Sequence, residues 1–286
     1  MFLDLPSRRF ALDRPRILGI VNVTPDSFSD GGRFFSPDDA IAQGVRLVEE
    51  GADALDIGGE STRPQGATPV TVDEELRRVV PVVRALRARL PDVPLSVDTV
   101  KAAVARAMLD EGVEIINDVS AFRLDGAMAS VCAASRAAVI LMHSRGGVSE
   151  MATYRHASYG NDVMDDVIGE LAPAIATAEL AGIEPTRIAV DPGIGFAKRT
   201  EHSVAVLAAL DHLVALGYPV VVGVSRKRVV GELSGVSTPA ERIEGTIAAN
   251  VMALTLGARI FRVHDVRATR RALDVAWAIL RRREKA

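Results

Sequence analysis

Residues 94–120 read PLSVDTVKAAVARAMLDEGVEIINDVS, and this stretch shows the unit from which the rest of the chain is built. Two short apolar runs, Pro94–Thr99 and Ile115–Ser120, have the length and the Val and Ile content of buried strands. Between them, Val100–Glu111 has the apolar spacing of an amphipathic helix. Gly112 follows this helix, where a left-handed cap is favourable and glycine adopts it without strain. The stretch therefore predicts a strand–helix–strand unit.

The same unit recurs along the whole chain. The predicted strands are Arg16–Val23, Ala54–Gly59, Pro94–Thr99, Ile115–Ser120, Ala137–His143, Arg187–Gly193, Pro219–Ser225 and Arg259–Asp265. The predicted helices are Asp38–Glu50, Val72–Leu90, Val100–Glu111, Leu124–Ser135, Asn161–Ala181, Thr200–Leu216, Pro239–Leu256 and Val266–Arg283. Strand and helix alternate eight times with short joints, which predicts a single (β/α)8 barrel, a TIM barrel of the α/β class, over residues 16–286. Residues 1–15 are predicted to be a short N-terminal extension, arranged as a hairpin over the bottom of the barrel.

A doubly wound open sheet is the alternative fold. It typically has five or six strands and often carries a glycine fingerprint after its first strand. Here the first strand is followed by Asn22–Asp26, which contains no glycine. The barrel is therefore favoured.

Composition excludes several classes of function. Lys and Arg total 34 and Asp and Glu total 37, and the net charge of −3 argues against a nucleic-acid binder. The single cysteine, Cys132, excludes an intramolecular disulfide and is expected to be a small buried hydrophobic residue. No apolar run approaches the roughly 18 residues that span a bilayer, and the N-terminus lacks the apolar core of a signal peptide. These features predict a cytoplasmic protein with no membrane partner.

Polar side chains gather where the predicted strands end. They are Asn22, Glu60–Arg63, Asp98 and Thr99, Asn117 and Asp118, His143, Asp191, Ser225–Lys227, and Arg262, His264 and Asp265. In a barrel these ends converge on one mouth, where active sites of this fold lie. Asp56 lies deeper in its strand, and a structural role is favoured for it. For His143 a buried structural role and a functional one are equally open.

The mouth is expected to hold two kinds of chemistry. Carboxylates, an amide and an ammonium suit a flat heterocycle with alternating donors and acceptors. Those groups are provided by Asp98, Asn117, Asp191 and Lys227. A second set favours anions and predicts a phosphate or pyrophosphate site. That set comprises Thr62, Arg63, Arg262 and His264.

Seven motifs in these strand ends resemble, in order, those of the dihydropteroate synthase family. They are Asn22–Gly32, Gly58–Pro64, Ser96–Thr99, Ile116–Ser120, Asp191–Phe196, Ser225–Lys227 and Arg262–Asp265. The resemblance covers residues 17–279. It implies condensation of 6-hydroxymethyl-7,8-dihydropterin pyrophosphate with 4-aminobenzoate, with Mg²⁺, by a folate-pathway enzyme that sulfonamides target.

The resemblance also implies roles for individual residues. Pterin binding falls to Thr62, Asp98, Asn117, Asp191 and Lys227. Pyrophosphate binding falls to Asn22, Arg63, Arg262 and His264, and Asn22 is the expected Mg²⁺ ligand. The implied catalytic residues are Asp98, Lys227, Arg262 and His264. The expected 4-aminobenzoate pocket consists of Phe28, Arg63, Pro64, Phe196 and Arg228. A homodimer is expected through the Ala-rich faces of Thr246–Leu256 and Ala268–Ile279.

Four positions depart from the family pattern. Arg228 stands where the family usually has Ser, Gln65 is a one-residue insertion, Ser144 replaces a usual Met, and Ala197 replaces a usual Gly. Arg228 is expected either to clamp the carboxylate of 4-aminobenzoate or to point away to solvent. A rim position is favoured on the assumption that Lys227 and Arg228 lie on an extended segment, where adjacent side chains point to opposite sides. Two other functions stay open, a non-catalytic pterin-binding paralogue and a pterin-dependent methyltransferase. The pyrophosphate-binding residues argue against the methyltransferase.

Overall fold

The structure, a computed structural model, describes residues 1–23, 36–61 and 69–283. Within these residues, eight parallel strands form a barrel in the order β8–β7–β6–β5–β4–β3–β10–β9. The strands are β3 (Arg16–Asn22), β4 (Ala54–Gly58), β5 (Leu95–Asp98), β6 (Ile115–Asp118), β7 (Ala138–Met142), β8 (Ile188–Asp191), β9 (Val221–Val222) and β10 (Ile260–Val263). A parallel bridge between Val190 and Val220 joins β8 to the β9 segment and closes the ring. The TIM-barrel prediction is confirmed.

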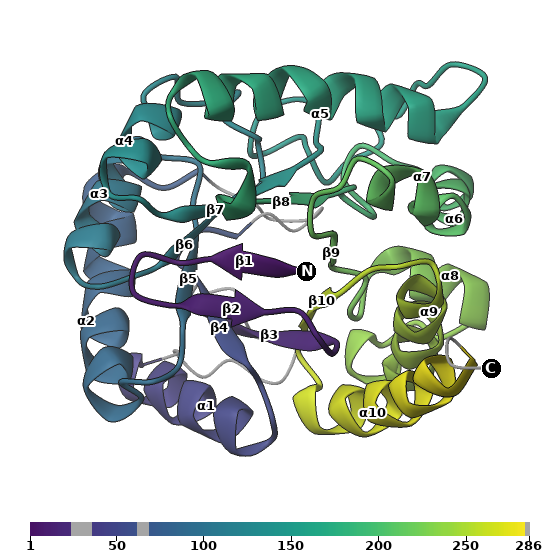
Figure 1. The fold of residues 1–286 in the computed structure, drawn as a ribbon, viewed down its shortest axis with the longest axis horizontal. Helices are drawn as coiled ribbons and strands as arrows, with labels where there is room; N and C mark the ends of the chain where they lie inside the picture. Colours follow the sequence, from purple (N-terminus) through teal and green to yellow (C-terminus); the bar gives the residue numbers. More distant parts are fainter. Residues whose placement is uncertain (24–35, 62–68, 284–286) are drawn as a thin grey trace.

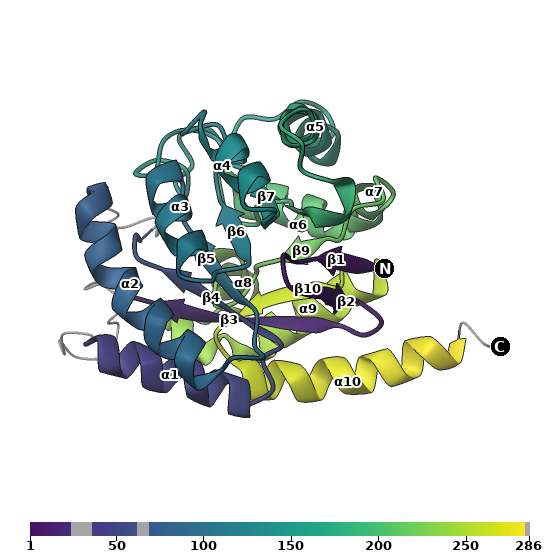
Figure 2. The same ribbon diagram turned by 60° about the vertical axis from the view of Figure 1, so that its left-hand side comes forward.

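Helices surround the strands on the outside (Figure 1). They are α1 (Pro37–Glu49), α2 (Val72–Arg89), α3 (Ala102–Asp110), α4 (Met128–Ala134), α5 (Val163–Leu180), α6 (Thr200–Ala208), α7 (Leu210–Val214), α8 (Arg228–Ser234), α9 (Ile243–Thr255) and α10 (Val266–Arg283). Two single turns of 3-10 helix, Pro185–Arg187 and Pro239–Glu241, precede β8 and α9. Figure 2 shows α10 lying lengthwise along the outside of the barrel. No helix in the described ranges is both long enough and apolar enough to cross a bilayer.

Local sequence explains where several helices begin and end. The Ser36 side chain accepts a hydrogen bond from the Asp39 backbone N–H, and Pro37 is the first residue of α1. Thr71 caps α2 in the same way through the Glu74 N–H. Five glycines directly follow predicted helices, and all have positive φ, from 87° to 106°: Gly51, Gly112, Gly182, Gly217 and Gly257. These helix ends were therefore encoded locally.

The helix expected over Pro239–Leu256 begins as the 3-10 turn Pro239–Glu241 before α9, and two further helical segments differ from the prediction. The helix expected over Thr200–Leu216 breaks at Ala209 into α6 and α7. The second difference is α8, which was not predicted because β-branched residues such as Val229 and Val230 favour strands. Both valines are buried on this short helix, which ends at Gly235 with φ 71°. Lys227 is consequently the N-cap of a helix and Arg228 its first residue. The assumption that both lie on an extended segment was wrong.

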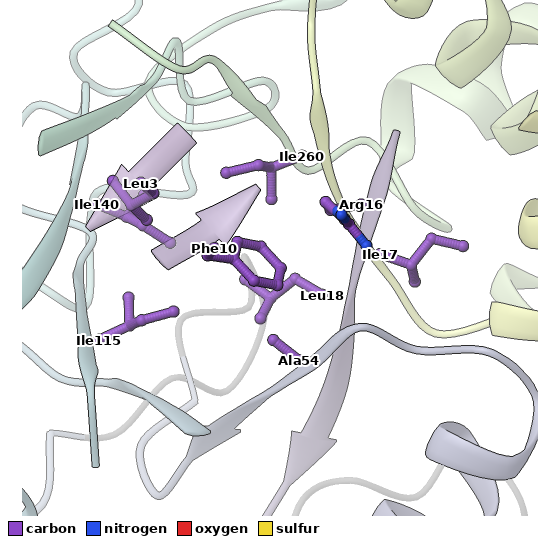
Figure 3. A pocket seen from close by; sticks show the side chains of 9 residues that line it. All are labelled: Leu3, Phe10, Arg16, Ile17, Leu18, Ala54, Ile115, Ile140 and Ile260. Carbon is purple, nitrogen blue, oxygen red and sulfur yellow. The ribbon is translucent and has the colours of Figure 1, made fainter. Parts of the chain in front are cut away.

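A hairpin covers the bottom of the barrel. It consists of β1 (Phe2–Asp4) and β2 (Arg9–Ala11), which pair antiparallel. Figure 3 shows Leu3 and Phe10 of the hairpin facing the interior side chains of the barrel across a small hollow. The hollow is lined by Leu3, Phe10, Arg16, Ile17, Leu18, Ala54, Ile115, Ile140 and Ile260. Because eight of these nine side chains are apolar, this end of the barrel is a closed core and not a polar site.

The barrel interior is layered along the strands. Apolar interior residues beside the hairpin include Ala54, Ile115, Ala189 and Ile260. Two residues later on the same strands are Asp56, Asn117, Asp191 and Arg262. Side chains two apart on a strand point the same way, so these polar groups also face the interior. The mouth therefore holds a polar layer on an apolar floor.

Candidate active site

Asp56 is the centre of the polar layer. It is fully buried on β4. Its Oδ1 accepts a hydrogen bond of 2.6 Å from Ser96 Oγ, and its Oδ2 accepts bonds of 3.0 Å from Asn117 Nδ2 and 2.5 Å from Arg262 Nε. These partners come from β5, β6 and β10. A structural role was predicted for Asp56, and its hydrogen bonds show that it fixes two of the candidate site residues, Asn117 and Arg262.

Arg262 also bridges to Asp98, where its Nη2 lies 2.8 Å from Asp98 Oδ2. Burial raises the pKa of Asp98 to about 7, although Arg262 opposes the shift. Burial lowers the pKa of Arg262, but Asp56 and Asp98 outweigh it and raise that pKa above its usual range. The guanidinium therefore stays charged, while Asp98 titrates near neutral pH. Within this ion pair, Asp98 is the group whose charge responds to pH.

Asp191 and Lys227 lie close to Arg262. A Cβ atom built on Gly223 would lie 3.8 Å from Asp191 Oδ2, from Lys227 Nζ and from Arg262 Cβ, so these three side chains border the same space. Burial lowers the pKa of Lys227 to about 8, and Asp191 opposes that shift. Burial also raises the pKa of Asp191. An ammonium and a carboxylate thus border the same space.

The loop after β8 contacts both of these groups. The Gly193 N–H donates to Asp191 Oδ1 at 2.7 Å, and Lys227 Nζ donates to the Ile194 carbonyl at 2.6 Å. Lys227 Nζ also lies 4.5 Å from the centre of the Phe196 ring. The loop therefore supports one side of the site with its backbone and with an aromatic face.

His264 and Ser225 form the mouth-facing pair after β10 and β9. Ser225 Oγ lies 3.0 Å from His264 Nδ1 and accepts a hydrogen bond of 3.1 Å from the His264 N–H. The next residue, Arg226, forms two parallel bonds to Asp265, at 2.9 and 2.5 Å. Arg226 has φ 58°. These hydrogen bonds attach the Ser225–Lys227 turn to the segment that follows β10.

Arg228 lies on the edge of the mouth. Its guanidinium carbon is 3.9 Å from the centre of the Tyr154 ring, and its Nε is 4.0 Å from Glu232. The side chain is 38 % exposed. Arg199 approaches the same ring, at 5.3 Å. Arg228 therefore stacks on an aromatic ring that links two arginines of the rim.

Some predicted site residues lie outside the described ranges. They are Phe28, Thr62, Arg63 and Pro64, together with the inserted Gln65. Asn22, the predicted metal ligand, ends β3 beside Gly58 of β4. Among the described residues, no group of three or more His, Cys, Asp or Glu side chains is arranged to hold a metal ion. One neutral amide oxygen is consistent with Mg²⁺ only if phosphate oxygens and water supply the other ligands.

Lys198 and Glu170 were not identified from the sequence. Lys198 follows the loop after β8 and is 1 % exposed, and its Nζ lies 2.7 Å from His143 Nδ1. His143 Nε2 in turn lies 3.1 Å from Glu170 Oε2. The position of Lys198 close to the Asp191–Phe196 motif could have indicated a role in the site. It was not recognised because a lysine outside a strand end is ordinarily exposed to solvent.

The whole barrel is similar to known proteins. Residues 18–264 match the family described as pterin binding enzyme. Dihydropteroate synthase of Mycobacterium leprae is 44 % identical over 270 residues, which cover 93 % of each chain. The solved structure of Xanthomonas albilineans dihydropteroate synthase with 4-aminobenzoic acid superposes with a TM-score of 0.89, 49 % identity and 98 % coverage of each chain. That of Thermus thermophilus dihydropteroate synthase in complex with 6HMPPP has a TM-score of 0.84 and 42 % identity, and covers 98 % of this chain and all of that chain.

Proposed function

The chain belongs to the pterin binding enzymes and, among them, to the dihydropteroate synthases, and from this we propose how its residues share the reaction. The enzyme condenses 6-hydroxymethyl-7,8-dihydropterin pyrophosphate with 4-aminobenzoate to give 7,8-dihydropteroate and pyrophosphate in folate biosynthesis. One observation carries the residue roles. Asp98, Asn117 and Arg262 are joined through Asp56 in one buried polar layer, and Asp191 and Lys227 border the same space as Arg262.

The polar layer is proposed to hold the pterin. Asp98 and Asp191 accept hydrogen bonds from N–H groups of the ring, and Asn117 and Lys227 contribute donors. Thr62, outside the described ranges, is proposed to contact the same substrate. Buried polar groups without a partner are costly, so a ring that satisfies all of them is strongly preferred over one that does not.

Asp98 is proposed to stabilise the transition state. As the C–O bond to pyrophosphate breaks, positive charge spreads from the methylene carbon into the dihydropterin ring. A carboxylate fixed beside that ring in a site shielded from water stabilises this charge. The aniline nitrogen of 4-aminobenzoate then forms the new C–N bond and releases its proton. Exclusion of water prevents hydrolysis of the cation.

Arg262 and His264 are proposed to bind the departing pyrophosphate, together with Asn22 and Arg63. Arg262 uses Nε and Nη2 on Asp56 and Asp98, and its third nitrogen, Nη1, is the one proposed for the anion. The amide oxygen of Asn22 is proposed to hold Mg²⁺ alongside the pyrophosphate oxygens. When bound, the metal neutralises charge on the leaving group.

The 4-aminobenzoate pocket is proposed at the rim. Its residues are Phe28, Arg63, Pro64, Phe196 and Arg228. Sulfonamides, which carry a similar aniline, are proposed to compete for this pocket. A structure of the Yersinia pestis dihydropteroate synthase is described with a sulfonamide drug complex.

A homodimer in the cytoplasm is also proposed. Three apolar side chains on α9 and α10 are exposed although they are large. They are Met252 at 61 %, Val275 at 63 % and Ile279 at 58 %. Exposed apolar side chains on two adjacent helices are typical of a subunit interface. Analytical ultracentrifugation of the wild type and of Met252→Glu tests it, and a monomeric wild type would contradict it.

A pyrophosphate-release assay tests the proposed reaction. Release is expected only with both substrates and Mg²⁺ present, and EDTA should abolish it reversibly. A protein that binds the pterin but never releases pyrophosphate would be the non-catalytic paralogue. Methyl transfer from a methylated tetrahydrofolate without pyrophosphate release would support the methyltransferase instead.

A further inference from the structure

The buried lysine behind the site has a complete set of hydrogen-bond acceptors. Lys198 Nζ lies 2.7 Å from His143 Nδ1, 3.2 Å from the Gly193 carbonyl oxygen and 3.3 Å from the Phe196 carbonyl oxygen. An ammonium group has three hydrogens to donate, and a neutral amine has only two. The three acceptors therefore match the charged form and bind it from three directions.

His143 is oriented by the next residue in the chain of hydrogen bonds. Because Nδ1 accepts from Lys198, Nε2 carries the hydrogen and donates it to Glu170 Oε2 over 3.1 Å. Burial and the charge of Lys198 lower the pKa of His143 to about 4, so the ring is neutral. The hydrogen bond from His143, together with Arg145, lowers the pKa of Glu170 to about 2. Glu170 is thus ionised, and one tautomer of His143 is selected.

The same histidine also touches the loop through its backbone. The His143 N–H donates to the Asp191 carbonyl at 2.9 Å. Gly193 has φ 68°, and a Cβ atom at this position would lie 1.9 Å from the His143 carbonyl oxygen. The loop after β8 is therefore seated directly against His143, at a spacing that only glycine permits.

The other side of this loop contacts the proposed pterin residues. Gly193 donates to the Asp191 carboxylate, Ile194 accepts from Lys227, and the Phe196 ring lies under the Lys227 ammonium. Lys198 holds the carbonyl groups of two of these three loop residues, Gly193 and Phe196. A shift of the loop would therefore move Asp191 and Lys227 relative to each other.

We propose that His143 and Lys198 are positioning residues, which fix residues 192–197 against the barrel so that Asp191 and Lys227 meet the pterin in the correct geometry. The inference rests on the proposed pterin site. Glu170 serves by orienting the His143 ring. Neither His143 nor Lys198 is assigned any contact with substrate.

Stability alone is a poor reason for this arrangement. A charge taken out of water has a large desolvation cost, which apolar residues of similar volume avoid. Burial lowers the pKa of Lys198 well below its usual range, which reflects that cost, whereas the nearby Asp191 carboxylate and the three hydrogen-bond acceptors favour the charged form. A methionine would fill the space without that cost, whereas only a group with three donors holds His143 and two carbonyls together. The contribution of Lys198 is therefore to fix the conformation of the loop.

Two variants of His143 separate positioning from packing. His143→Asn keeps an amide oxygen near the place of Nδ1 and can accept from Lys198. His143→Leu fills the space without an acceptor. Calorimetry with 6-hydroxymethyl-7,8-dihydropterin pyrophosphate and Mg²⁺ measures binding, and urea unfolding measures stability. We expect Asn to stay within about threefold of the wild-type affinity and Leu to weaken binding by about tenfold or more.

Lys198→Met and His156→Leu complete the design. Lys198→Met should weaken binding of the pterin substrate about as much as His143→Leu does. If His143→Leu does not fold, Lys198→Met provides the same test. His156 pairs with Glu150 at 2.9 Å in the same connection after β7. Within the described residues it forms no hydrogen bond with Lys198, so His156→Leu should bind like the wild type.

Three outcomes would contradict the proposal. Unchanged affinity in His143→Leu and Lys198→Met would overturn it while leaving the pterin site intact. Equal loss of affinity in His143→Asn and His143→Leu, in proportion to their loss of stability, would show a packing role only. A wild type that binds no pterin pyrophosphate would overturn the proposed site and this inference with it.

Discussion

Arg262 donates to Asp98 over 2.8 Å, and the two residues are 164 positions apart in the chain. The same guanidinium donates to Asp56 over 2.5 Å. It was predicted from the sequence as a pyrophosphate ligand, yet it is held by the two carboxylates deep in the mouth. Arg262 therefore connects the residues proposed to bind the pterin to those proposed to bind pyrophosphate, and binding of both substrate groups is expected to respond to its replacement.

Arg262→Lys tests that connection. A lysine keeps the charge but lacks the planar fork that contacts two carboxylates at fixed angles. We expect kcat/KM for the pterin substrate to fall by about tenfold or more. Arg259→Lys is the control, since Arg259 precedes the same strand and stacks on Trp277 at 4.9 Å, at the other end of the barrel. Equal activity of the two variants would contradict the role of Arg262.

Asp191→Asn tests the proposed role of Asp191 in pterin binding. The change keeps the size of the side chain and replaces an acceptor with a donor, and a mispaired buried group costs about 1–3 kcal/mol. Pterin affinity measured by calorimetry should fall about tenfold or more, while the melting temperature of the unliganded protein barely changes. A variant that lost stability and kept pterin affinity would make Asp191 structural.

The pKa of Asp98 predicts a pH-dependent stability. Its ordinary value is 3.8, and in the folded protein it is about 7. Between pH 3.8 and about 7, Asp98 is protonated in the folded protein and ionised in the unfolded chain. The free energy of unfolding therefore decreases as pH rises through this range. Asp98→Asn has no such proton. The free energy of unfolding of the variant, relative to wild type, should therefore rise from pH 5 to about 7 and then level off.

Urea unfolding of both proteins at several pH values measures this difference. The opposite trend would be a free energy of unfolding that increases more in the wild type than in the variant as pH rises. It would mean that the Arg262 charge lowers the pKa of Asp98 more than burial raises it.

Arg228→Ser tests whether Arg228 lies at the rim of the mouth or binds the 4-aminobenzoate carboxylate directly. The arginine is partly exposed and stacked on Tyr154, where a cation–π contact is worth about 0.5–1 kcal/mol. We expect the KM for 4-aminobenzoate to rise only a few-fold, with kcat and the pterin KM nearly unchanged. A rise of about a hundredfold would show a direct carboxylate clamp. A fall in KM would show that the arginine obstructs the pocket.

Gly193→Ala should be severe, and Gly217→Ala supplies its control. Both glycines have positive φ, at 68° and 88°, but a Cβ on Gly193 would lie 1.9 Å from the His143 carbonyl oxygen, while one on Gly217 would have nothing within 4 Å. Left-handed backbone costs about 1–2 kcal/mol in either variant. Gly193→Ala should lose at least about 3 kcal/mol in urea unfolding, because the clash adds to that strain. Similar losses in the two variants would contradict a tight seat for the loop.

The sequence by itself determined the barrel and the level of its site. Strand and helix periods are local properties, and polar residues at the ends of predicted strands, such as Asp191 and Arg262, already placed the site at one mouth of the barrel. Helix ends at Gly51 and Gly112 were likewise encoded in single residues. Short helices carry a weaker signal, and α8 was missed because Val229 and Val230 favour a strand locally and form a helix only when packed.

Only the tertiary structure decided which polar groups are partners. Asp56 and Arg262 are 206 positions apart, and Lys198 and His143 are 55 apart. Their contacts depend on closure of the ring and on the register between strands, neither of which leaves a mark near either residue. For the same reason Lys198 was not distinguishable from a solvated surface lysine. Partner choice in a buried network is set by three-dimensional distance and desolvation, and these exist only once the chain has folded.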